Sequence, residues 1–295
     1  MTRILANFSP ATAGACLMIF AGLLFALVNT MVQWGAMKLG LPPTRIAFWQ
    51  YLIATLWFVP WTLWHNPHAL RTAVLPKHIL RVGFAVIGVQ LWVTGLAYVP
   101  IWQAIALIML SPFFVTACAG LWLGETISLQ RWAAVATGFV GGMIILAPWS
   151  DAFTYHALYP VGAAIFWGLT SLMTKEMSAQ ENPTTLTLYL LMLLTPVNAV
   201  LSLDAGLGFE TGTTGILLVC AGLCTAVAQY ALARAYSVAD AAYLQPFDHL
   251  KLPFNVGLGL LVFGYAPPGS LWLGAALIVA ASFSLLIQEA RQQAA

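Results

Sequence analysis

The stretch Tyr243-Leu244-Gln245-Pro246-Phe247-Asp248-His249-Leu250-Lys251-Leu252-Pro253-Phe254 places charged groups inside an apolar segment. The surrounding sequence, 241–263, is long enough to cross a bilayer as one helix. Burying Asp248, His249 and Lys251 in lipid is costly, so these side chains should face protein or a water-filled cavity. Pro253 removes an amide donor and should free the carbonyl of His249 one turn earlier. The stretch therefore predicts a bent helix with a binding site at membrane depth.

The composition places this chain among polytopic membrane proteins. Of its 295 residues 61% are hydrophobic and only 7% are charged, against about 25% charged residues in a soluble domain. The net charge is +2 and the basic residues are scattered, which argues against a nucleic-acid partner. Cys220 and Cys224 lie four residues apart without a nearby His or acid, so we predict no metal site and no cofactor.

Hydropathy predicts an all-α integral membrane protein with ten spans. They are 13–34, 44–64, 82–99, 101–123, 131–148, 156–174, 184–203, 213–234, 241–263 and 270–288. If the N-terminus is cytoplasmic, eight Lys and Arg residues fall inside and only Lys38 and Arg45 fall outside. This bias predicts that both termini are cytoplasmic. The longest connection, 65–81, contains Arg81.

The chain also repeats itself. Ser111-Pro112-Phe113-Phe114 leads to Leu123-Gly124-Glu125, and Leu252-Pro253-Phe254-Asn255 leads to Phe263-Gly264-Tyr265, at an offset of 140 or 141 residues. We therefore expect two five-helix units, residues 1–148 and residues 149–295. Because five is odd, the second unit enters the membrane upside down. Inverted repeats of this kind are a transporter architecture whose site lies near the bilayer midplane at the repeat interface.

These motifs, together with Ala97-Tyr98 and the run from Gly138 to Leu146, resemble the EamA repeat of the drug/metabolite transporter (DMT) superfamily. Tyr265 departs from the pattern, because the family usually has an acid there. The resemblance implies ten helices around a central cavity in the bacterial inner (plasma) membrane, in a monomer or weak homodimer. It is strongest to the YddG-type aromatic amino-acid exporters. It implies export of small metabolites, foremost aromatic or apolar amino acids, by alternating access; a broad-specificity drug or metabolite exporter is the alternative.

Under this reading the cavity should be lined by helices 1, 3, 4, 6, 8 and 9. We expect deep amide and aromatic side chains on those helices to bind the substrate. Amides can hold polar groups of a ligand and aromatic rings can stack on it, although the same side chains also serve as interhelical contacts and ordinary packing. The candidates are Gln90, Trp102, Trp167, Gln229, Tyr230 and Gln245.

Asp248, His249 and Lys251 form a second candidate set, a coupling or structural charge cluster. His249 titrates near neutral pH and is the candidate if transport is proton-coupled. The structural alternative is that Asp248 and Lys251, three residues apart, only neutralise each other. An intramembrane enzyme could use Asp248 and His249 as acid and base, or Ser111 as nucleophile. No HExxH or GxSxG motif supports this, so we predict a transporter and not an enzyme.

Overall fold

The computed structural model describes residues 9–122, 128–151, 153–239 and 241–293, and these residues contain helices and no strands. Glu125, which closes the repeated motif of the first half, lies outside the described residues. The helices are α2 (Pro10–Met37), α3 (Pro43–His65), α4 (Leu75–Tyr98), α5 (Ile101–Ile108), α6 (Ser111–Trp122), α7 (Leu129–Leu146), α8 (Leu158–Met177), α9 (Pro183–Leu201), α10 (Gly212–Val238), α11 (Ala241–Asp248), α12 (Lys251–Phe263) and α13 (Gly269–Gln293).

The predicted ten-span, all-α fold is confirmed, with changes in detail. Seven of the described helices are long and apolar enough to cross a membrane unbroken. The remaining spans are α13 and two broken spans, α5 with α6 and α11 with α12. α4 begins at Leu75, seven residues before the predicted start at residue 82. Arg81 was assigned to a loop by sequence, and this was wrong, because it lies inside α4 and is buried.

The helix of each broken span is interrupted at an equivalent position in the two halves. α5 ends before Met109 and α11 ends before His249, 140 residues later. Pro112 and Pro253 lie in the first turn of the helices that follow, where a missing amide hydrogen costs least. The prediction of a bare carbonyl at His249 was wrong: it accepts a hydrogen bond from the Leu252 amide at 3.1 Å. A tight turn thus satisfies the backbone that proline would otherwise leave unpaired.

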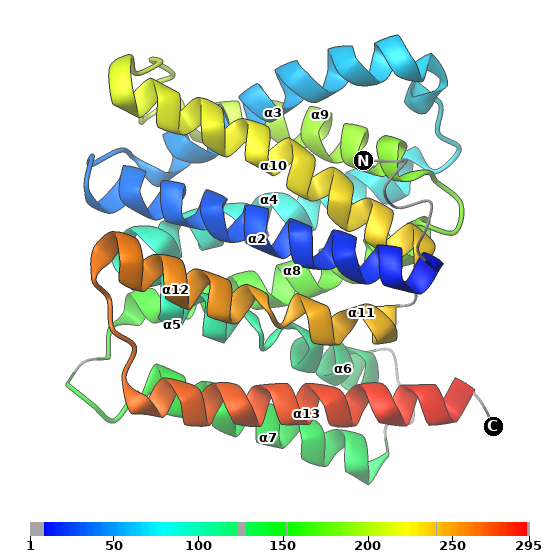
Figure 1. Cartoon of the computed structure of the whole chain (residues 1–295), viewed down its shortest axis with the longest axis vertical. Coiled ribbons are helices and arrows are strands. Elements are labelled where there is room, and N and C mark those ends of the chain that lie inside the picture. The colour runs from blue at the N-terminus through cyan, green and yellow to red at the C-terminus, as the bar shows by residue number, and fades with distance from the viewer. Residues whose placement is uncertain (1–8, 123–127, 152, 240, 294–295) are drawn as a thin grey trace.

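Helix packing follows a two-fold exchange of the halves (Figure 1). α2 packs against α10 as α8 packs against α4, and α3 packs against α10 as α9 packs against α4. The equivalent helices α3 and α9 pack against each other, as do α7 and α13, and α5 of one broken span packs against α12 of the other. The described parts of both termini lie at one end of the helices (Figure 1). This is the arrangement expected of two inverted five-helix repeats around a common centre.

The glycines of α7 pack inside the chain. A Cβ at Gly141 would lie 2.6 Å from the carbonyl oxygen of Gly274, so the α7 and α13 backbones touch there. Gly138 and Gly142 face the side chains of Phe113 and Leu110 in the same way. In the described structure the small residues of α7 serve helix packing within one chain.

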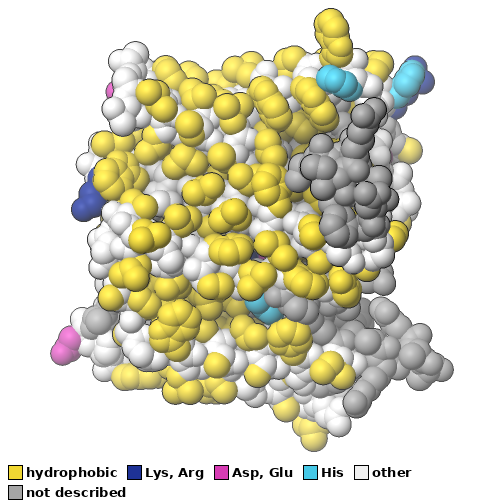
Figure 2. Space-filling model, viewed as in Figure 1, with side chains coloured by type: hydrophobic (Ala, Val, Ile, Leu, Met, Phe, Trp, Pro, Cys, Tyr) yellow, Lys and Arg dark blue, Asp and Glu magenta, His cyan; other side chains and the backbone are white. Residues whose placement is uncertain are grey.

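The outer surface carries a broad apolar band. Figure 2 shows one face covered mainly by hydrophobic side chains, with most of the visible Lys, Arg, Asp and Glu side chains at its left and right edges. Those edges correspond to the two ends of the helices in Figure 1. An apolar band between polar ends is the surface that a bilayer requires of a spanning protein.

Candidate functional site

A cavity of about 370 Å³ lies between the two halves. Its wall includes residues from all the predicted lining spans: α2, α4, α5 with α6, α8, α10, and α11 with α12. α3 and α13 add Gln50, Tyr51 and Ser282 to it, which the sequence did not predict. The volume falls within the range of roughly 300–1,000 Å³ typical of small-molecule sites.

Aromatic and amide side chains share the cavity wall. Phe25, Trp92 and Trp167 offer flat apolar surfaces, whereas Asn29 and Gln229 offer amide groups. Serine and threonine hydroxyls from α6 and α8 also face the space. A mostly apolar wall with a few placed polar groups suits a flat organic ligand that has one polar edge.

Only some of the predicted binding residues line the cavity in the described structure. Trp167 and Gln229 line the cavity, whereas Gln90, Trp102 and Tyr230 are not among its described lining residues. Gln90 donates to the Asn198 side-chain oxygen at 2.7 Å, so it acts as an interhelical contact. Tyr230 packs against Phe58 and Trp61, and Trp102 packs against the hydrophobic core. The side chain of Gln245 lies outside the described part of the chain.

The charge cluster lies at the break between α11 and α12. Lys251 Nζ donates to Asp248 Oδ2 at 2.6 Å, and each side chain is about one quarter exposed, at 24% for Lys251 and 25% for Asp248. His249 is buried, and its Nε2 lies 3.2 Å from Ser282 Oγ on α13. All three residues line the cavity. The break therefore brings an ion pair and an imidazole to the ligand space; their role in coupling stays a prediction.

A chain of side-chain hydrogen bonds connects the aromatic wall to this cluster. Trp92 Nε1 donates to Asn29 Oδ1 at 3.0 Å, and Asn29 Nδ2 donates to Asn255 Oδ1 at 3.0 Å. Asn255 Nδ2 in turn donates to the Lys251 carbonyl oxygen at 2.6 Å. These bonds join α4, α2 and α12 beside the cavity. Asn29 is a polar residue within a predicted span, and nothing in the sequence indicates its partners.

The two ends of the cavity differ in how firmly they are closed. At the end away from the termini, buried Gln33 Nε2 donates to the carbonyl oxygens of Leu96 and Val99 at 3.1 and 2.7 Å. At the termini end, Lys175 Nζ makes the corresponding contacts with Tyr236 and Ala239, both at 3.3 Å. Lys175 and Tyr236 themselves line the cavity. The ligand space therefore reaches toward the end where both termini lie.

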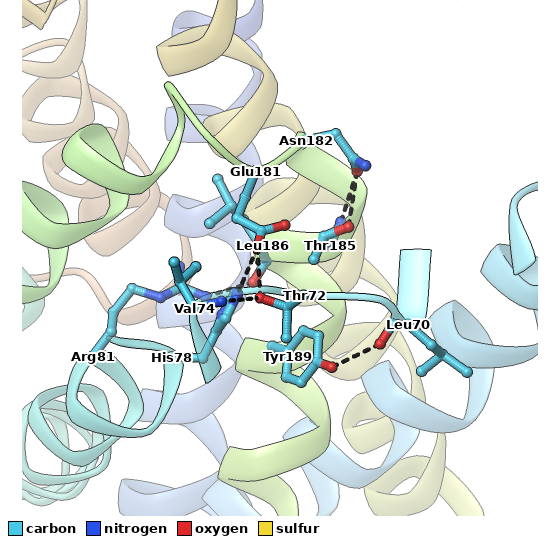
Figure 3. A network of polar contacts seen from close by, with 10 residues as sticks. All are labelled: Leu70, Thr72, Val74, His78, Arg81, Glu181, Asn182, Thr185, Leu186 and Tyr189. Atoms are coloured by element: carbon cyan, nitrogen blue, oxygen red, sulfur yellow. Dashed lines mark hydrogen bonds and ion pairs between the residues drawn. The ribbon is translucent and has the colours of Figure 1, made fainter. Parts of the chain in front are cut away.

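A polar network lies near that end, around the start of α4 (Figure 3). Thr72 Oγ1 donates to Glu181 Oε1 at 2.5 Å, and buried His78 lies 4.0 Å from the same carboxylate oxygen. The His78 ring stacks on Tyr189, with centroids 4.4 Å apart. Arg81 projects from the same helix toward α8 and α9, donating to Thr174 Oγ1 at 3.1 Å and to the Leu186 carbonyl at 2.6 Å.

Comparison with known proteins identifies the family. The model of the "EamA-like transporter family" matches residues 12–147 and 155–287, nearly the whole chain. The chain belongs to this family. It is a multi-pass inner-membrane transporter of a small metabolite within the DMT superfamily, and it is not an enzyme.

Named relatives narrow the comparison further. Riboflavin transporters from Rhizobium johnstonii and Vibrio cholerae are each 52% identical, covering 99% and 90% of this chain and 97% and 90% of their own lengths. An S-adenosylmethionine uptake transporter from Rickettsia felis is 26% identical over 83% of each chain. A solved crystal structure shares the fold, with a TM-score of 0.63, 18% identity and coverage of 96% and 98%. These relatives give no support to the predicted amino-acid substrate; the broader metabolite alternative fits better.

Proposed function

We propose that this protein carries riboflavin across the inner membrane by alternating access. The observation that supports this most is the 52% identity, over nearly the full length of both chains, to a protein named a riboflavin transporter. The matched region includes the helices that line the cavity. The proposal replaces amino-acid export, which was the main prediction from sequence.

The cavity wall suits the chemistry of a flavin. The isoalloxazine ring is flat and apolar on its dimethylbenzene side, and its pyrimidine side carries hydrogen-bond donors and acceptors. Trp92 and Trp167 provide aromatic surfaces on which such a ring could stack. Gln50 and Gln229 provide amides for its polar edge, and the nearby hydroxyls suit the ribityl chain. In this proposal the ring stacks on a tryptophan and its polar edge meets an amide.

Several further features belong to the same proposal. The chain divides into inverted repeats at 1–148 and 149–295, both termini are cytoplasmic, and the unit of transport is a monomer or a weak homodimer in the lipid bilayer. Loading proteoliposomes on either side tests the predicted outward direction.

Binding can be measured directly, because flavin fluorescence is quenched when the ring stacks on tryptophan. We expect purified protein to quench riboflavin fluorescence saturably and Trp167→Ala to weaken binding. Stacking of a flat heteroaromatic ring is worth ~1–3 kcal/mol, which corresponds to roughly 5- to 150-fold in Kd. Proteoliposomes should also take up riboflavin at a rate that unlabelled riboflavin suppresses and that phenylalanine leaves unchanged.

Trp64→Ala is the matched control, since Trp64 is 87% exposed on α3 and does not line the cavity. It should bind riboflavin as the unaltered protein does. Saturable uptake of phenylalanine without uptake of riboflavin would reject the proposal and restore the amino-acid reading. Equal losses in the Trp64 and Trp167 variants would reject the assigned stacking position.

A further inference from the structure

Arg81 is a buried cation without a described acidic partner. Its side chain is 2% exposed, and its hydrogen bonds go to neutral oxygens, the Thr174 hydroxyl and the Leu186 carbonyl. Its Nε is buried and has no hydrogen-bond partner. Among the described residues, no carboxylate lies within ion-pair distance of the guanidinium. A buried charge of this kind is costly unless an anion compensates it.

The carboxylate of the neighbouring polar network already has partners. Glu181 accepts the short hydrogen bond from Thr72 and faces the ring of His78 (Figure 3). Hydrogen bonds that only hold α4, α8 and α9 together do not require a charged side chain. An amide or hydroxyl in place of the Arg81 guanidinium could make the same contacts to Thr174 and Leu186. The guanidinium is the group that proteins use for bidentate recognition of phosphate and carboxylate.

Arg81 also lies next to the ligand space. It lines a small pocket of about 30 Å³ beside the main cavity. Space for one water takes roughly 10–15 Å³ on this measure, so the pocket has room for about two oxygen-sized groups. Five residues line both spaces: Trp167, Ser171, Gln229, Leu232 and Tyr236. A ligand in the cavity therefore has Arg81 at one side of its Trp167 wall.

The charge of the surrounding wall favours an anion. Arg81, Lys175 and Lys251 line these two adjoining spaces, and Asp248 is the carboxylate among their described lining residues. Asp248 is paired with Lys251. Lys175 contacts the backbone carbonyls of Tyr236 and Ala239, which are neutral oxygens. Two cations at the termini end thus lack a described acidic partner.

We propose that Arg81, assisted by Lys175, forms an anion subsite that takes the phosphate group of a ligand held in the main cavity. The inference rests on the proposed flavin substrate, and the ligand is then a flavin whose ribityl chain ends in a phosphate monoester. With the ring at Trp167, the chain extends toward Arg81 and two phosphate oxygens enter the side pocket. This transporter then binds flavin mononucleotide more tightly than riboflavin.

The test compares the two flavins on full-length purified protein by fluorescence quenching. We expect flavin mononucleotide to bind at least about tenfold more tightly than riboflavin, and Arg81→Met to remove that difference. Arg71→Met is the matched control, since Arg71 is an exposed cation close to the start of the same helix, and it should keep the difference. Arg81→Lys keeps the charge without the forked donors and should keep part of the preference.

Inorganic phosphate provides an independent probe that needs no flavin. It should raise the Tm of the unaltered protein and the Arg71 variant, and leave the Tm of the Arg81→Met variant unchanged. Equal affinity for the two flavins, or a preference that survives Arg81→Met, would overturn the subsite. If neither flavin binds, the proposed function fails, but the phosphate experiment still tests the subsite. A Tm rise that requires Arg81 supports the subsite, and a Tm rise that persists without Arg81 overturns it. If Arg81→Met does not fold, the same comparisons are made with Arg81→Lys, where an unreduced preference and shift overturn the subsite.

Discussion

Removing one charge of the Asp248–Lys251 ion pair should measure how much this pair stabilises the folded protein. The pair is short, at 2.6 Å, but each side chain is about one quarter exposed. Exposed pairs contribute ~0.2–1 kcal/mol, and removing one partner of a buried pair costs ~3–5 kcal/mol. An intermediate site should lose about 2 kcal/mol in Asp248→Asn. At roughly 2–4 °C per kcal/mol, the Tm should fall by ~4–8 °C.

The assay is a double-mutant cycle on detergent-purified protein, with Asp248→Asn, Lys251→Met and the two combined. Removing both charges leaves neither unpaired, so the double variant should recover most of the lost stability. Its transport rate then separates the two roles of the cluster. A structural pair predicts normal riboflavin uptake in the double variant, whereas a coupling pair predicts a folded protein with slow uptake.

A coupling energy below about 0.5 kcal/mol would refute the energetic reasoning, because it would equal that of a solvent-exposed pair. Normal transport by the double variant, with an unchanged pH profile, would assign the cluster to structure alone. Asp204 supplies a control outside the cavity: it has no described salt bridge, and Asp204→Asn should leave the Tm unchanged.

Two further predictions concern the helix contacts and the topology. Asn29→Leu removes the hydrogen bonds with Trp92 and Asn255. Each such bond contributes ~0.6–1.7 kcal/mol within a membrane protein, so the free energy of unfolding should fall by about 2 kcal/mol. An unchanged free energy in a denaturant titration would show that those bonds contribute nothing. The topology can be tested in a variant whose native cysteines have been replaced. There, Asp151→Cys should react with an impermeant maleimide on intact cells, and Ala73→Cys should react only after permeabilisation. The opposite pattern would reverse the predicted orientation.

Much of the architecture could be predicted from the sequence because the bilayer imposes strong rules. Spanning segments need length and apolar character, and these are visible without knowing their partners. Pro253 allowed the bend in the second half to be predicted, but the equivalent break before Pro112 was not predicted, because residues 101–123 were expected to form one span. The tight turn that satisfies the His249 carbonyl could not be predicted either. A proline in the sequence shows which amide donor is lost, but not which other amide replaces it.

The site was harder to predict because a single sequence does not show which way a side chain points in a helix that is apolar on every side. Gln90 and Gln229 look alike along the chain, but Gln90 meets Asn198 on α9 and Gln229 faces the cavity. Arg81 was missed for a different reason. The apolar run resumes around it, so hydropathy placed the helix start after it, and nothing local marks that charge as buried.

The equivalent breaks in the two halves also bear on ligand orientation. Counting 140 residues back from Asp248 and Lys251 leads to Ile108 and Ser111, and all four line the cavity. A chamber with identical halves would offer a ligand two poses of equal energy, related by the two-fold axis. Here one half carries both charges and the other carries none at the equivalent positions. The degeneracy is therefore lifted, and a symmetric scaffold left by gene duplication holds an unsymmetrical molecule in one preferred direction.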